Sequence, residues 1–226
     1  VAPSGGYGGS LAMTGASVQN AGAVSAQAYA ALDLDSISGA TILGRAGSGS
    51  LTLNSGANLS ASGAGDSLVL ATGVNFINNA GAGSLAASAG RWLVYSTTPA
   101  LDIRGGLAYN FKQYGMSYGA TPYAGLGSGN GFIYSAAPSL TPSLIGTTGK
   151  VYDGTTLASL TSANYATAGA LDSDTIVMSN PATGIYADKN AGAGKTVSAT
   201  VTLTGASNGS ASVYGYQLSS PTATGT

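Results

Sequence analysis

The sequence predicts an all-β protein that begins as a parallel β-solenoid. Three observations support this prediction. Short apolar alternations are separated by glycine, and the chain of 226 residues has 36 Gly and only 7% charged residues. The third observation is a repeat spacing of about 17 residues, which a flat antiparallel sheet with similar alternation does not predict. Glycine suits the corners between short strands, and inward apolar side chains would stack on copies above and below.

The repeat spacing is clearest in the first part of the chain. The same offset superimposes residues 50–53 on residues 67–70, and a third copy begins at Ser84. Residues 32–34 and 41–43 have the pattern of further strands, with less regular spacing. We therefore expect solenoid turns throughout residues 1–90.

Residues 91–148 differ because they are rich in aromatic side chains. Nine of the seventeen aromatic residues lie between Trp92 and Tyr134, and four prolines interrupt any long strand or helix. The open last turn of a solenoid exposes its core and a row of unpaired strand groups. We expect the strands and loops of residues 91–148 to form an aromatic capping or extension segment that covers this end.

Residues 149–226 are predicted to form a separate β-rich module. Period-two alternation predicts strands over residues 174–178, 197–203 and 213–218, and a turn over residues 205–209. The pattern of residues 158–170 fits a short helix and a weak strand equally well.

Composition excludes several classes of protein. The chain has no His, no Cys and a formal net charge of -1. It therefore has no thiolate nucleophile, no Ser-His-Asp triad, and neither imidazole nor thiolate for zinc. Seven Lys and Arg residues are too few for a nucleic-acid stripe, and no apolar run is long enough to span a bilayer. We expect no cofactor, no metal, no nucleic-acid partner and no membrane insertion.

The first residues do not show the charged and apolar regions of a signal peptide. We therefore expect an internal piece or a mature fragment of a protein.

The aromatic segment supplies the candidate ligand-binding residues Trp92, Tyr114, Tyr118 and Tyr123. Tyrosine and tryptophan rings present flat apolar faces with a polar edge, which suits sugars and protein partners alike. The three tyrosines lie in Gly- and Pro-rich sequence, so we expect their rings to be exposed. Packing in the core or in the cap is the alternative, and it is favoured for Trp92 because the surrounding strand is apolar.

Two pairs of carboxylates are candidates for metal sites. Asp33 with Asp35, and Asp172 with Asp174, each form the D-x-D fragment that is common in calcium sites. Neither lies in the Gly-Gly-x-Gly-x-Asp pattern of calcium-binding β-helices. We expect all four to be solvated turn residues.

A polysaccharide lyase or hydrolase is the catalytic alternative, because β-helices often carry that chemistry. Such an enzyme would need paired carboxylates, or a Lys/Arg-plus-metal cluster, in one groove. Asp35 and Asp66 are separated by close to two repeats of the expected length, and would then be near neighbours. The chain offers little other acid–base chemistry, so we expect no enzyme.

A Lys–Asn isopeptide bond near Asp188 is a further hypothesis. A measured mass of the intact chain that shows no loss of ammonia would rule it out.

Several motifs resemble a known family of bacterial surface proteins. Residues 90–96, Gly-Arg-Trp-Leu-Val-Tyr-Ser, closely resemble the end of the repeat region in filamentous-haemagglutinin-type adhesins. Residues 150–156, Lys-Val-Tyr-Asp-Gly-Thr-Thr, resemble the YDG module that is often found in tandem in such adhesins. Further matching stretches are residues 65–71, 75–78, 105–107, 111–114, 129–135, 187–190 and 194–195. The chain departs from the module pattern at residues 213–216, where Val-Tyr-Gly-Tyr replaces an Asn-Tyr pair.

The resemblance implies a right-handed parallel β-helix, followed by a small β-grasp-like or immunoglobulin-like module. It implies a fragment of a large Gram-negative exoprotein, exported through an outer-membrane transporter by two-partner secretion and displayed on the cell surface. The expected function is attachment to host cells or other bacteria, through a surface glycan or protein, with roles in virulence and biofilms. A rigid stalk that presents a distant binding tip is the alternative function.

Overall fold

The computed structural model describes residues 9–15, 17–120 and 126–226, which form two compact units. The first unit extends to Ala136 and includes Ser210–Tyr214, and the second comprises Ala137–Gly209 together with Gly215–Thr226. The described residues form strands and two one-turn 3-10 helices, so the prediction of an all-β protein is confirmed. Within those ranges, no helix is long and apolar enough to cross a membrane.

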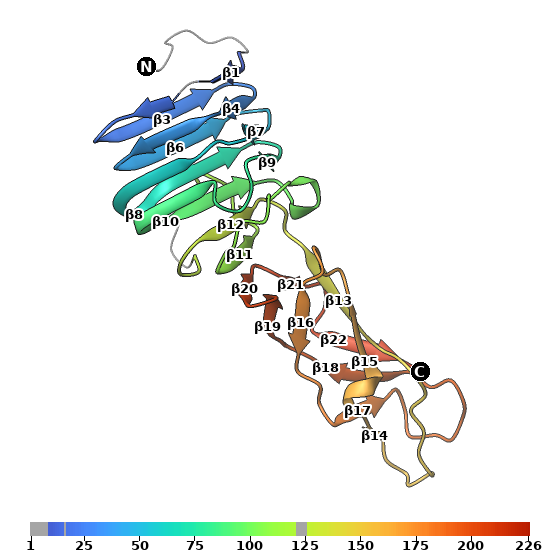
Figure 1. The fold of residues 1–226 in the computed structure, drawn as a ribbon. Coiled ribbons are helices and arrows are strands. Elements are labelled where there is room, and N and C mark those ends of the chain that lie inside the picture. The colour runs from blue at the N-terminus through green and yellow to red at the C-terminus, as the bar shows by residue number, and fades with distance from the viewer. Residues whose placement is uncertain (1–8, 16, 121–125) are drawn as a thin grey trace. The chain divides into compact units, whose positions relative to one another are not determined.

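The first unit is built from strands that pair in parallel, drawn in blue to yellow-green in Figure 1 except for β20, which is red. Its elements are β1 (Leu11–Ala12), β2 (Ser17–Gln19), β3 (Ala23–Ala28), β4 (Leu32–Leu34), β5 (Ser36–Gly39), β6 (Thr41–Ala46), β7 (Leu51–Leu53), β8 (Leu59–Thr72), β9 (Phe76–Asn78), β10 (Leu85–Ser96), η1 (Pro99–Leu101), β11 (Phe111–Tyr114), β12 (Gly131–Tyr134) and β20 (Ala211–Tyr214).

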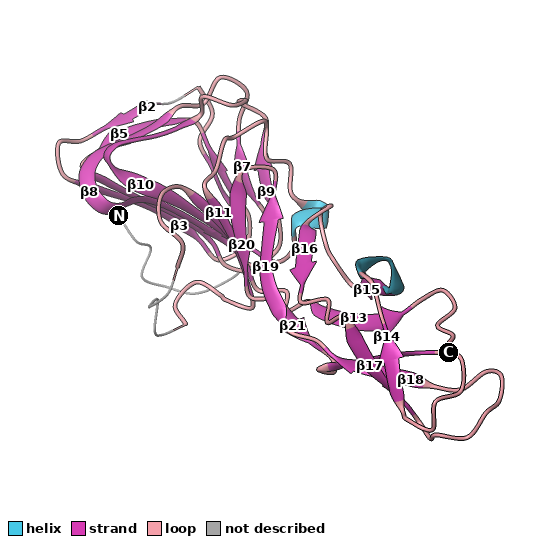
Figure 2. Cartoon of the chain, turned by 90° about the horizontal axis from the view of Figure 1, so that it is seen from below, coloured by secondary structure: helices cyan, strands magenta, loops and turns pink. Residues whose placement is uncertain are grey.

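The strands of the first unit lie on different sides of a shared interior. One sheet has the order β1-β4-β7-β9, and a second contains β5, β8, β10 and β12. The long strand β8 belongs to two sides, because its first half pairs with β5 and its second half pairs with β6. In Figure 2, β5, β10 and β7 are seen on three sides of this unit.

The predicted repeat spacing is wrong. Leu32 aligns with Leu51 and Leu51 aligns with Phe76, so successive steps are longer than expected and differ from one another. The expected spacing would place Leu68 beside Leu51, but Leu68 aligns with Ile42 on one side and Trp92 on the other. Leu51 and Leu68 share a sequence pattern because both point into the interior, but they do so from different sheets.

The aromatic segment continues the parallel sheet and supplies much of the core. Trp92 lies in the second half of β10, which pairs with β8 on one side and β12 on the other. Phe132 is fully buried and lies 5.3 Å from the Trp92 ring and 6.2 Å from the Phe76 ring, measured between centroids. These residues therefore extend the parallel sheet beyond β8 and contribute aromatic side chains to its core.

Strand order becomes irregular after β10. In space β12 lies between β10 and β11, although β11 precedes β12 in the chain. β20, which comes from much later in the sequence, pairs with β11 in parallel. Regular stacking in sequence order thus ends at β10.

The second unit is mostly antiparallel. β14, β17, β18 and β22 form one sheet, β13 pairs with β15 and β21, and β16 pairs with β19. Its elements are β13 (Ser139–Leu144), β14 (Leu157–Ser159), η2 (Ser162–Asn164), β15 (Tyr165–Ala168), β16 (Thr175–Met178), β17 (Thr183–Tyr186), β18 (Val197–Thr200), β19 (Leu203–Asn208), β21 (Gln217–Leu218) and β22 (Thr222–Gly225). Its core residues are Leu144, Ala158, Leu160, Val197, Ala199, Val201 and Ala223.

The expected elements of the second unit are partly correct. The strand predicted at residues 174–178 corresponds to β16. The turn predicted at residues 205–209 is wrong, because most of that stretch lies in β19 and only Gly209, with a φ of 57°, turns the chain. The single strand predicted at residues 213–218 is split into β20 and β21 by Gly215, which has a φ of 91°.

Candidate functional site

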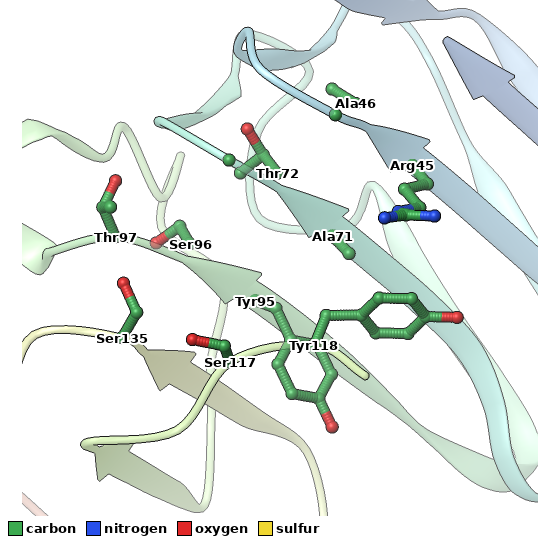
Figure 3. Close-up of a pocket in the computed structure, with 12 residues that line it drawn as sticks. Arg45, Ala46, Ala71, Thr72, Tyr95, Ser96, Thr97, Ser117, Tyr118 and Ser135 are labelled. Carbon is green, nitrogen blue, oxygen red and sulfur yellow. The ribbon is translucent and has the colours of Figure 1, made fainter. Parts of the chain in front are cut away.

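A groove on the outer face of the first unit is the best candidate for a binding site. The register aligns Arg45 of β6 with Ala71 of β8, and Ala71 with Tyr95 of β10. Because neighbouring strands lie ~4.8 Å apart, these side chains form one row across the sheet. Ala71 contributes only a methyl group, so the row has a gap between Arg45 and Tyr95 (Figure 3).

Tyr118 reaches this gap from the loop that follows β11. Its ring meets the Tyr95 ring edge to face, with 5.5 Å between centroids, and the Arg45 guanidinium carbon lies 5.7 Å from the Tyr118 centroid. Met116 and Leu126 pack with Tyr118 against an apolar cluster on the outer face of the sheet. The cluster consists of Ala71, Leu93, Tyr95, Phe111 and Ile133. We call the site the Tyr118 groove.

Hydroxyl groups line the rest of the Tyr118 groove, which has a volume of about 220 Å³. Thr72 and Thr97 donate to backbone carbonyls, and Ser96 donates to Asp102 over 2.7 Å. Within the part of the chain that the structure describes, the hydroxyls of Ser117 and Ser135 form no hydrogen bond. Those two hydroxyls can therefore donate to and accept from a ligand.

The structure buries two of the four predicted binding residues. Trp92 is 2% exposed and Tyr114 is 1% exposed, so neither ring offers a face to a ligand. The prediction that Tyr114 is exposed is wrong, because it is the last residue of β11 and stacks on Tyr134 with 5.6 Å between centroids. Tyr118 is partly exposed and lies in the groove, whereas Tyr123 lies outside the described residues.

Sequence reasoning missed Arg45 and Tyr95 as groove residues. Strand alternation indicates an outward Arg45, since the flanking Gly44 and Ala46 are both buried. The partners of Arg45 depend on register and on a loop from a distant part of the chain. Alternation alone could not have found them.

The acidic residues of the first unit do not gather into one site. Asp35 accepts a hydrogen bond from Asn54 over 2.8 Å, and Asp66 forms an ion pair with Arg91. The predicted alignment of Asp35 with Asp66 depended on the expected repeat spacing, which the register contradicts. No group of three or more acidic residues is placed to hold a metal ion within residues 9–15, 17–120 and 126–226.

Asp174 in the second unit is not the solvated turn residue that its D-x-D pattern predicts. It is 7% exposed, and its two carboxylate oxygens accept from the Tyr216 hydroxyl and the Asn208 amide, each over 2.9 Å. Both oxygens are thus committed to neighbours in the fold. Asp172 occupies the left-handed region at a φ of 52°, which Asp tolerates better than most residues.

The Lys150 ammonium organises the turn formed by residues 150–155. It donates to Asp153 Oδ1 over 2.7 Å, and to both the carbonyl and the hydroxyl of Thr155 over 2.8 Å. It also lies 5.7 Å from the centroid of Tyr186. An ammonium has three donors, so Lys150 is fully used in holding this turn.

These contacts predict a carboxyl group that stays ionised at lower pH than an ordinary aspartate. The hydrogen bond from Lys150 is the main reason that the pKa of Asp153 falls from 3.8 to about 2. Because the folded pKa is lowered, the contribution of the ion pair is complete above pH ~4 and is lost as the pH falls toward 2. A carboxyl-carbon NMR titration should find a midpoint near 2, and Lys150→Gln should raise it toward 3.8. A wild-type midpoint near 3.8 would show that the ion pair does not persist in solution.

Comparisons with known proteins identify part of the chain. A family model for the YDG domain matches residues 136–223, so the match begins earlier than the expected residue 149 and close to the start of the second unit. Comparison with curated proteins gave no match, and neither did comparison with solved structures. The chain therefore contains a YDG domain at residues 136–223.

Proposed function

We propose that this chain is a segment of a large surface-displayed adhesin of the filamentous-haemagglutinin type, and that it attaches to a ligand without catalysis. The observation that carries the proposal is the Tyr118 groove, in which a partly exposed ring, an unpaired guanidinium and free hydroxyls converge within the described part of the chain. The YDG domain is consistent with such an adhesin, because the residues before it resemble the repeat region of filamentous-haemagglutinin-type adhesins. The full protein would be exported by two-partner secretion through an outer-membrane transporter of a Gram-negative cell.

The proposal includes a more specific fold for each unit. Parallel pairing around a shared interior supports a β-helix for the first unit, with the irregular order of β11 and β12 marking its end. Its right-handed sense is what the resemblance implies. The mostly antiparallel sheets of the second unit support an immunoglobulin-like module, because a β-grasp fold needs an α-helix and the described residues there form only η2.

A stalk is the second candidate function, and the burial of the aromatic residues favours it. Trp92, Tyr114 and Tyr134 are at most 2% exposed, so most of the aromatic segment serves packing. Stacked parallel strands give a stiff rod whose length grows with the number of turns. In this case the ligand would bind elsewhere in the full protein.

Attachment of the purified chain to glycan arrays and to cultured host cells tests the two functions. We expect saturable binding that Tyr118→Ala abolishes, because that ring forms one wall of the groove. Tyr29→Ala is the matched control, since Tyr29 is 70% exposed and does not line the groove. A folded, monomeric chain that binds neither arrays nor cells would overturn the adhesive function and leave the stalk.

A further inference from the structure

We infer that the ligand of the Tyr118 groove is a sugar unit that carries a carboxylate, and that Arg45 binds this carboxylate. The inference rests on the proposed adhesive function and names the chemical class of its ligand. Three features of the groove support it: its charge, its hydroxyl lining and its size.

The charge of the groove is set by one residue. Arg45 is the only charged side chain among the twelve lining residues, and no acidic residue in the described ranges pairs with it. Its guanidinium lies beside the Tyr118 ring, and its N–H donors form no hydrogen bond within the described part of the chain. A guanidinium presents parallel donors that match the two oxygens of a carboxylate, and an aromatic ring beside it limits the orientations it adopts.

The hydroxyl lining favours a sugar over a peptide. Five of the twelve lining side chains are Ser or Thr, and apart from the Tyr95 and Tyr118 rings the apolar ones are only alanines. Sugar hydroxyls need partners that both donate and accept, which Ser117 and Ser135 can provide. A peptide would need an apolar pocket or an open strand edge, and the strands beneath the groove are paired on both sides.

The size of the groove suits about one sugar ring of a ligand. Its volume of about 220 Å³ lies below the roughly 300–1,000 Å³ typical of sites for drug-sized molecules. Arg45, Ala71 and Tyr95 are held on paired strands, so most of the site is formed before the ligand arrives. A rigid, pre-formed site loses less entropy on binding than a mobile one.

Acidic sugars and their methyl esters provide a matched test, because esterification removes the charge and keeps the ring. We would titrate the full chain by NMR with methyl glucuronide, methyl galacturonide and N-acetylneuraminic acid, each beside its methyl ester and a 6-sulfated neutral sugar. At least one acid should bind about tenfold or more tightly than its ester. Arg45→Gln should reduce that ratio to about twofold or less, whereas Lys189→Gln, the same change of charge at an exposed lysine outside the groove, should leave it unchanged.

The other outcomes separate this inference from the adhesive function. Equal binding of acid and ester, lost in Tyr118→Ala, would overturn the carboxylate and leave an adhesive groove. Stronger binding of the sulfated sugar, or a preference that Arg45→Gln leaves intact, would also overturn it. Attachment to cells with no response to any sugar would overturn the sugar class alone. Failure of both sugars and cells would overturn the inference together with the adhesive function.

Discussion

Replacing Phe132 with alanine is expected to lower the free energy of unfolding of the first unit by about 3–5 kcal/mol. Phe132 is fully buried and contacts the rings of Phe76, Trp92, Tyr109 and Tyr134, with centroid distances of 5.2–6.3 Å. Loss of the ring would leave a cavity between strands that are fixed by hydrogen bonds on both sides. Because such strands cannot close together, little of the cavity would be refilled.

Trp92 provides the measurement, since it is the single tryptophan of the chain and lies inside the first unit. Urea denaturation followed by its fluorescence should show a lower midpoint for Phe132→Ala. Tyr29→Ala removes a ring that is 70% exposed and should change the free energy of unfolding by less than about 0.5 kcal/mol. Similar midpoints for Phe132→Ala and the wild type would contradict the central packing role of Phe132.

The second large effect is expected for Asp174→Ala in the second unit. Asp174 accepts hydrogen bonds from Tyr216 and Asn208, and the Tyr216 hydroxyl in turn accepts from the Leu171 amide over 2.8 Å. Alanine would leave the buried Tyr216 hydroxyl and the half-buried Asn208 amide without this acceptor. We expect the free energy of unfolding of the second unit to fall by about 2–3 kcal/mol. A buried polar group without a partner costs about 1–3 kcal/mol, and hydrogen bonds to a charged group are stronger than those between neutral groups.

Hydrogen exchange at the Leu171 amide follows this network directly. Asp174→Ala should speed its exchange, and Asp174→Asn should have a smaller effect because the amide keeps one acceptor oxygen. Tyr216→Phe should speed exchange at the same amide by removing the hydroxyl that it donates to. Unchanged exchange at Leu171 in Asp174→Ala and Tyr216→Phe would show that the network is not a stabilising unit.

The features that were predicted correctly depend on residues that are close together in the sequence. Alternation of apolar and small residues marked the strands, since successive side chains in a strand point to opposite faces. Residues 150–156 resemble the YDG module, and in the structure Lys150, Asp153 and Thr155 of this stretch hold one local turn. Both signals are local in the chain, and neither requires knowledge of distant neighbours.

Register between distant segments explains what the sequence did not predict. Leu51 and Leu68 look like copies of one another, yet they line the same interior from different sheets. Tyr114 stands at the edge of a Gly-rich stretch that reads as a loop, but β11 extends far enough to bury it. A self-comparison of sequence detects matching patterns and cannot tell which of them are hydrogen-bonded neighbours.

The sequence by itself determined an all-β chain with an apolar interior, glycine at its turns and a YDG domain at its C-terminal side. Only the tertiary structure decided where a ligand could bind, because the Tyr118 groove unites three strands and a loop. Arg45 and Tyr118 lie far apart in the chain, and a single methyl group at Ala71 opens the space between Arg45 and Tyr95. Such a juxtaposition follows from strand register, which depends on the packing of the whole unit and is not encoded in any short segment.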